Sequence, residues 1–142
     1  MFKEVLFAVD LNAPEAQQKA LNAALDRVKL SKGRLHVLTV VPDLGIGMVS
    51  SYFPDDFEQK VLKDTDKRLH DYVKAHVPAR TSVQHIVAQG TIYREIIRYA
   101  EKVGADLIVM ASHRPELKDY LLGPNASHVV KHANCSVLVV RD

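Results

Sequence analysis

The chain has 142 residues, of which 47% are hydrophobic and 25% are charged, a length and composition that fit one globular domain spanning residues 1–142. No segment approaches the roughly 20 apolar residues that a membrane-spanning helix requires, so we expect no membrane span. The formal net charge is only +2, and basic residues are mixed with acidic ones. Nucleic acid is therefore not an expected partner.

The amino-terminal residues lack the basic region and long apolar core of a secretory signal. Cys135 is the only cysteine, which excludes an internal disulfide and fits a reducing compartment. We therefore expect a cytoplasmic protein. The seven histidines are scattered and do not form a spacing such as His-x-x-x-His with a nearby carboxylate ligand, so we expect no metal site built by the chain alone.

The first predicted strand covers residues 4–10, where a nearly continuous apolar run indicates burial on both faces and parallel pairing. Asn12 and Glu15 resemble a capping box for the first helix, which Gly33 is expected to end. A second strand is predicted at residues 35–41. Residues 42–54 contain glycine and serine without a clear period, which predicts a loop within the domain.

A second helix is predicted from residue 55 until Pro78, which cannot continue a helix. After a strand at residues 82–88, Thr91 is suited to cap a third helix that Gly104 ends. Two further strands, at residues 107–111 and 137–140, flank a fourth helix at about residues 125–132.

Strands and helices thus alternate along the whole chain, and the last element is a strand. Parallel neighbours in a sheet are joined by right-handed crossovers over the sheet face. The sequence therefore predicts an α/β fold: a single doubly wound domain with a five-stranded parallel sheet flanked by four helices.

Asp10 stands where the first strand is expected to end. A carboxylate at the carboxyl edge of a parallel sheet accepts hydrogen bonds from a ribose hydroxyl or an adenine amino group. Aspartate is also favoured in turns for local reasons, so the residue type alone leaves both roles open.

The segment after the fourth strand contains small residues, Ala111 and Ser112, that let the main chain approach a phosphate. His113 and Arg114 follow and add hydrogen-bond donors and positive charge. A solvated loop would have the same composition, so a phosphate contact is one of two interpretations.

Gly123, Pro124 and Asn125 begin the last predicted helix. Free N–H groups and the helix dipole attract an anion at such a position. Ordinary initiation of a helix by Gly-Pro is the equal alternative.

Residues 111–115, 120–123, 125–126 and 129–141 resemble the carboxy-terminal signature of the universal stress protein family. The ATP-binding signature of that family is Gly, two residues, Gly, nine residues, Gly and then Ser or Thr. Here Ala111 and Arg114 occupy the first two glycine positions, and only eight residues separate Arg114 from Gly123. The sequence Ala-Ser-His-Arg-Pro with this shorter spacer resembles the F-type branch.

The resemblance implies a fold like that of adenine nucleotide alpha hydrolases and a site for ATP, or for ADP or AMP, with Mg²⁺ as an accompanying ion. It implies that the end of the first strand lines the adenosine and that the last helix completes a phosphate cradle. The residues implied to contact the nucleotide are Ala8, Val9, Asp10, Val40, Met110, Ala111, His113, Arg114, Gly123, Pro124 and Asn125.

Two of these assignments rest on the resemblance alone, because Val40 and Met110 are by residue type more often plain core residues. Pro124 stands where the family has Ser or Thr and offers neither a hydroxyl nor an N–H group. We therefore expect a weakened or altered phosphate contact, with the N–H groups of Asn125 and Ala126 still available.

The expected function is that of a cytoplasmic, dimeric regulatory sensor of the stress response that binds ATP and an unknown protein partner. Family resemblance implies a homodimer through the last strand, Ser136–Val140, which is expected at a sheet edge. No catalytic trio emerges from the residues. The alternatives are a nucleotide-free interaction module and a weak ATPase in which His113 or Asp10 positions water.

Overall fold

The structure, a computed structural model, describes residues 1–42, 56–112 and 122–141. Five strands form one sheet in which every neighbouring pair is parallel, in the order β3-β2-β1-β4-β5. The strands are β1 (Glu4–Ala8), β2 (Arg34–Pro42), β3 (Val83–Gly90), β4 (Leu107–Ala111) and β5 (Ser136–Val140). The predicted five-stranded parallel sheet is confirmed.

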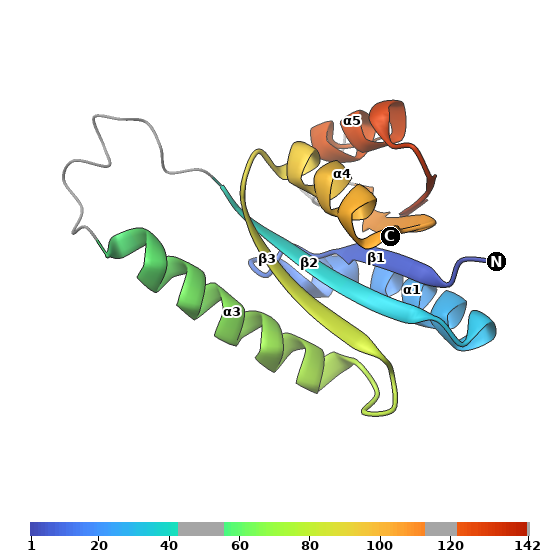
Figure 1. Cartoon of the computed structure of the whole chain (residues 1–142), viewed down its shortest axis with the longest axis horizontal. Helices are drawn as coiled ribbons and strands as arrows, with labels where there is room; N and C mark the ends of the chain where they lie inside the picture. Colours follow the sequence, from blue (N-terminus) through green and yellow to red (C-terminus); the bar gives the residue numbers. More distant parts are fainter. Residues whose placement is uncertain (43–55, 113–121, 142) are drawn as a thin grey trace.

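Within the described ranges four α-helices cover the sheet, two on each face (Figure 1). They are α1 (Gln18–Ser31), α3 (Phe57–His76), α4 (Ile92–Val103) and α5 (Pro124–His132). Helices α1 and α3 pack on one face, and α4 and α5 pack on the other. Among the described residues, none of these helices combines the length and hydrophobicity needed to cross a bilayer.

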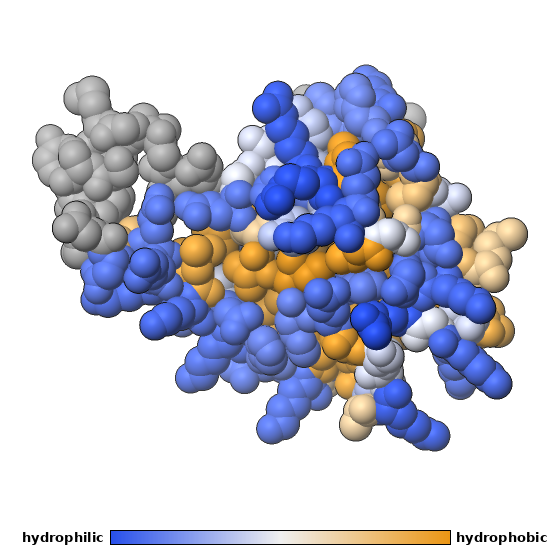
Figure 2. Space-filling model, viewed as in Figure 1, coloured by the Kyte–Doolittle hydropathy of each residue, from blue (hydrophilic) through white to orange (hydrophobic). Residues whose placement is uncertain are grey.

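Strand β1 is buried on both faces, as its apolar run predicts. Val5 and Phe7 pack into the core beneath α1 and α3, whereas Leu6 packs into the core beneath α4 and α5. All three side chains are fully buried. In Figure 2 hydrophobic residues accordingly form a band along the strands in the middle of the view, and hydrophilic residues cover the helices.

The predicted capping box is wrong. Helix α1 begins at Gln18, after one turn of 3-10 helix, η1 (Pro14–Gln17), and Asn12 lies in the turn before it. The side-chain Oδ1 of Asn12 accepts a hydrogen bond from Arg68 Nη2 at 3.2 Å. Asn12 is therefore held by helix α3 and does not cap a helix.

The first strand is also shorter than predicted, because β1 ends at Ala8. The N–H of Val9 still donates to the carbonyl of Leu38 in the neighbouring strand, at 2.9 Å. The N–H of Asp10, by contrast, donates to the Gln17 side chain at 2.7 Å. Asp10 therefore lies in the turn beyond the strand.

Two glycines were expected to end helices, and only Gly104 does so in the left-handed conformation, with a φ of 67°. Helix α1 ends at Ser31, and Lys32 takes the left-handed conformation in its place. Gly33 is required for a different reason, since a Cβ there would overlap the backbone carbonyl of Lys3. Its small size lets the chain enter β2 against the start of β1.

The remaining boundaries differ from prediction by a few residues. Thr91 occupies the N-cap position of α4, as predicted, but within the described residues its side chain makes no capping hydrogen bond. Helix α3 ends at His76, two residues before Pro78. Most of the loop predicted at residues 42–54, together with the expected start of α3 at residue 55, lies outside the described residues.

Candidate functional site

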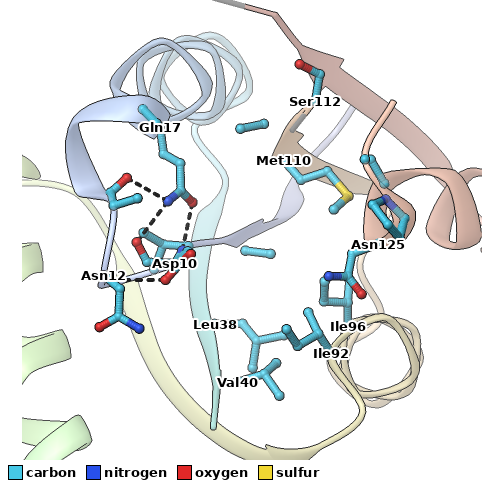
Figure 3. Close-up of a pocket in the computed structure, with 18 of the residues that line it drawn as sticks. Asp10, Asn12, Gln17, Leu38, Val40, Ile92, Ile96, Met110, Ser112 and Asn125 are labelled. Atoms are coloured by element: carbon cyan, nitrogen blue, oxygen red, sulfur yellow. Dashed lines mark hydrogen bonds between the residues drawn. The ribbon is translucent and has the colours of Figure 1, made fainter. Parts of the chain in front are cut away.

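A cavity of about 410 Å³ lies at the carboxyl ends of β1, β2 and β4 (Figure 3). Strand β1 leads to α1 on one face of the sheet, and the neighbouring β4 leads to α5 on the other. The two connections therefore diverge here, and such a switch point is where open α/β sheets bind ligands. The volume falls within the roughly 300 to 1,000 Å³ typical of small-molecule sites.

The cavity brings together predicted site residues that are far apart in the sequence. His113 and Arg114 lie outside the described residues. The other predicted residues all line the cavity: Ala8, Val9, Asp10, Val40, Met110, Ala111, Gly123, Pro124 and Asn125.

The turn after β1 forms one wall and is fixed by a short hydrogen-bond network. Gln17 Oε1 accepts from the N–H of Asp10 at 2.7 Å, and Gln17 Nε2 donates to the carbonyl of Asp10 at 2.8 Å. The Asp10 carboxylate accepts from the N–H of Asn12 at 2.9 Å. Asp10 thus caps its own turn, as one of its two interpretations predicted, and it also lines the cavity.

The wall beneath α4 is apolar. Leu38 and Val40 come from β2, Ile92 and Ile96 from α4, and Met110 from β4. Leu38, Ile96 and Met110 are buried in the core between the sheet and the helices α4 and α5, and Val40 and Ile92 pack against this core partly buried. Met110 is therefore both a core residue and a cavity-lining residue, whereas Val40 lines the cavity at the edge of the core. A slot of this kind suits a flat apolar ring.

The start of α5 forms a further part of the cavity wall, beside α4 (Figure 3). The N–H of Gly123 donates to the carbonyl of Ser112 at 2.7 Å, which holds the helix start against the end of β4. Pro124 is the first residue of the helix, and Ser127 donates to the carbonyl of Gly123 at 3.0 Å. Within the described residues, the N–H groups of Asn125 and Ala126 have no acceptor.

These features give the cavity a polar and an apolar half. The N–H groups at the start of α5 carry the positive end of the helix dipole, which attracts an anion. Asp10 is the only ionisable side chain among the described lining residues. The arrangement can hold a ligand that joins a flat apolar ring to an anionic group.

The sequence model of the universal stress protein family matches residues 1–141. The chain belongs to this family. Universal stress protein G of Shigella flexneri is 32% identical over 143 residues, which cover 99% of this chain and 100% of that relative.

Solved structures of universal stress proteins share this fold. That of MJ0577, from Methanocaldococcus jannaschii, has a TM-score of 0.83 at 27% identity and covers 100% of this chain and 97% of that chain. A universal stress protein in complex with cAMP has a TM-score of 0.64 at 20% identity and covers 99% of this chain and 97% of that chain.

Several cavity residues of this universal stress protein were not predicted from its sequence. They are Asn12, Ala13, Ala16, Gln17, Leu38, Pro42, Ile92 and Ile96. Gln17 alone carried a usable signal, because its position continues the buried stripe of Leu21, Ala24 and Val28 toward the amino end of the helix. A polar residue on a buried stripe must find internal hydrogen-bond partners.

Proposed function

We propose that the cavity binds an adenine nucleotide, ATP or in its place ADP or AMP, and that occupancy changes the surface offered to a protein partner in a stress response. One observation carries the proposal: the N–H groups of Asn125 and Ala126 lie without acceptors, within the described residues, at one end of a cavity with an apolar wall. The complex of a related fold with cAMP supports a ligand of this class.

The proposed pose follows the two halves of the cavity. The adenine ring lies in the apolar slot between Val40 and Met110, beside Ala8 and Val9. The Asp10 carboxylate accepts a hydrogen bond from a ribose hydroxyl, as carboxylates at this sheet edge commonly do.

The phosphates extend past Ala111 toward Gly123, Pro124 and Asn125. Pro124 has no N–H, so the donors are the amides of Asn125 and Ala126. From the family resemblance, His113 and Arg114 approach the phosphates. Asp10 is the only carboxylate among the described lining residues, so Mg²⁺ would be held chiefly by phosphate oxygens and water.

The finer family traits are part of the same proposal. The Ala-Ser-His-Arg-Pro sequence and the shortened spacer support the F-type branch. The position of β5 at the sheet edge supports a homodimer through Ser136–Val140. The single cysteine supports a cytoplasmic location.

Isothermal titration calorimetry with ATP, ADP, AMP and adenosine, each with and without Mg²⁺, tests the nucleotide site. We expect ATP to bind, and adenosine to bind about tenfold or more weakly, because hydrogen bonds to a charged phosphate are lost. Val40→Arg, which places a long charged side chain beside the adenine slot, should abolish binding. Leu30→Arg, at a residue that is 77% exposed on α1, is the matched control.

A second function is favoured by one specific observation, the imino acid at the first position of α5. If no nucleotide gives a binding heat and ATP leaves the melting temperature unchanged, the chain is a nucleotide-free dimeric interaction module. Should ATP bind, phosphate release over hours would distinguish a weak ATPase from a sensor that retains intact ATP.

A further inference from the structure

Gln17 is a polar residue in a buried position. It ends the 3-10 turn η1, only 7% of its surface is exposed, and it lines the cavity. Burial of an amide is costly unless its donors and acceptor are satisfied. The hydrogen-bond partners of this side chain therefore identify the part of the backbone that it fixes.

The carboxamide of Gln17 holds the backbone of Asp10 from both sides. Its Oε1 accepts from the N–H of Asp10 at 2.7 Å, and its Nε2 donates to the carbonyl of Asp10 at 2.8 Å and to the carbonyl of Ala13 at 3.0 Å (Figure 3). Both amide hydrogens and the oxygen are used. The reversed amide would set donor against donor at Asp10 and an oxygen against two carbonyls, so the network defines its orientation.

Helix α3 holds the same turn from the outside. Arg68 Nη2 donates to the carbonyl of Leu11 at 3.3 Å and to Asn12 Oδ1 at 3.2 Å. The N–H of Asn12 in turn donates to the Asp10 carboxylate at 2.9 Å. Gln17 is the buried member of this set, and its side chain bonds the backbone of Asp10 directly.

We infer that Gln17 is a positioning residue for the nucleotide site: it fixes the turn that carries the Asp10 carboxylate before the ligand arrives. The inference rests on the proposed function. Without this carboxamide the N–H of Asp10 would turn to water, while its carbonyl would keep the N–H of Ala13 at 3.1 Å, and the ligand would have to order the loosened turn on binding. The loss of this carboxamide should therefore weaken the hydrogen bonds from the ribose hydroxyls to the Asp10 carboxylate.

The test compares the affinities for ATP and for 2′,3′-dideoxy-ATP, which lacks both ribose hydroxyls. In the wild type, the hydrogen bond to a charged acceptor should make ATP bind about tenfold more tightly than the dideoxy analogue. In Gln17→Met, which keeps the side-chain length and removes every hydrogen bond, the ratio should fall below about threefold. A role confined to stability would weaken both ligands equally and leave the ratio intact.

Gln18→Met is the matched control, because Gln18 is the next residue and its Nε2 donates to Asn22 Oδ1 on the exposed helix surface. It should retain the wild-type ratio. If Gln17→Met fails to fold, Gln17→Glu replaces it, since a carboxylate keeps the acceptor and lacks the donors for the two carbonyls. An unchanged ratio in the folded Gln17 variant overturns the positioning role, whereas a wild type that binds no nucleotide overturns the proposed function itself.

Discussion

Pro124 decides how many donors the start of α5 can offer an anion. It is the first residue of the helix, where its fixed φ is favourable and its missing N–H breaks no helical hydrogen bond. The following amides, of Asn125 and Ala126, keep their N–H groups directed out of the helix start. Proline therefore favours formation of the helix and removes one donor from the proposed phosphate site.

Pro124→Ser should restore an N–H and a hydroxyl at this position. We expect ATP to bind about tenfold more tightly, because at least one hydrogen bond to a charged phosphate is gained, while adenosine affinity stays unchanged. Pro78→Ser, at a proline just beyond α3, is the control and should leave both affinities as they are. Equal affinity of ATP for the wild type and Pro124→Ser, measured by calorimetry, would argue against phosphate at this helix start.

At the residue scale the sequence predicted well wherever the chemistry was local. The helix start at Gly123 follows from residue type and spacing, and so does the place of Asp10 at the carboxyl edge of the sheet, although the strand itself ends at Ala8. Gln17 was missed because its partners, four and seven residues away, lie in a turn that folds back onto η1. Asn12 was misread because its partner, Arg68, comes from a helix far along the chain. Ile92 and Ile96 face the cavity only because α4 lies over the ends of β1 and β2.

At the scale of the element, β5 has an unpaired side, as β3 does at the other edge, since β5 pairs with β4 alone in the described sheet. Four consecutive apolar residues, from Val137 to Val140, are only half buried there. An apolar edge strand of this kind is a template for pairing with a second copy.

Val139→Lys should therefore convert a dimer into a monomer of 15.9 kDa, because a charge on the strand would have to be buried in the proposed interface. Analytical ultracentrifugation at micromolar concentration measures the change. Leu30→Lys, which adds the same charge at an exposed residue of α1, should remain a dimer. A wild type that sediments as a monomer, or a variant that stays dimeric, contradicts the assignment of this strand.

Element positions were predictable because each carries a local signal. Strand β4 has the predicted bounds, and α5 begins one residue earlier than expected, since proline is well tolerated at a first helical position. The errors occur where two elements meet. Gly33 was read as a helix stop, and its actual role, a close approach to the Lys3 carbonyl, depends on a strand that is distant in the sequence.

At the scale of the whole molecule, alternating strands and helices predicted the fold class but left the order of the strands open. In the order β3-β2-β1-β4-β5, the second and third strands are added on one side of β1. The chain then crosses back, and β4 pairs with the other side of β1. This reversal creates the cavity, because the chain leaves β1 and β4 toward opposite faces. Local periodicity carries no record of such long-range pairing.

The proposed role of the amides of Asn125 and Ala126 is to receive the phosphates of an adenine nucleotide. Amide chemical shifts of the ¹⁵N-labelled chain, followed by NMR during titration with ATP and, in parallel, with adenosine, test it most directly. We expect both amide signals to move with ATP and to stay nearly still with adenosine, since only ATP brings acceptors to the helix start. Signals of Asn125 and Ala126 that remain unmoved at saturating ATP would contradict the claim.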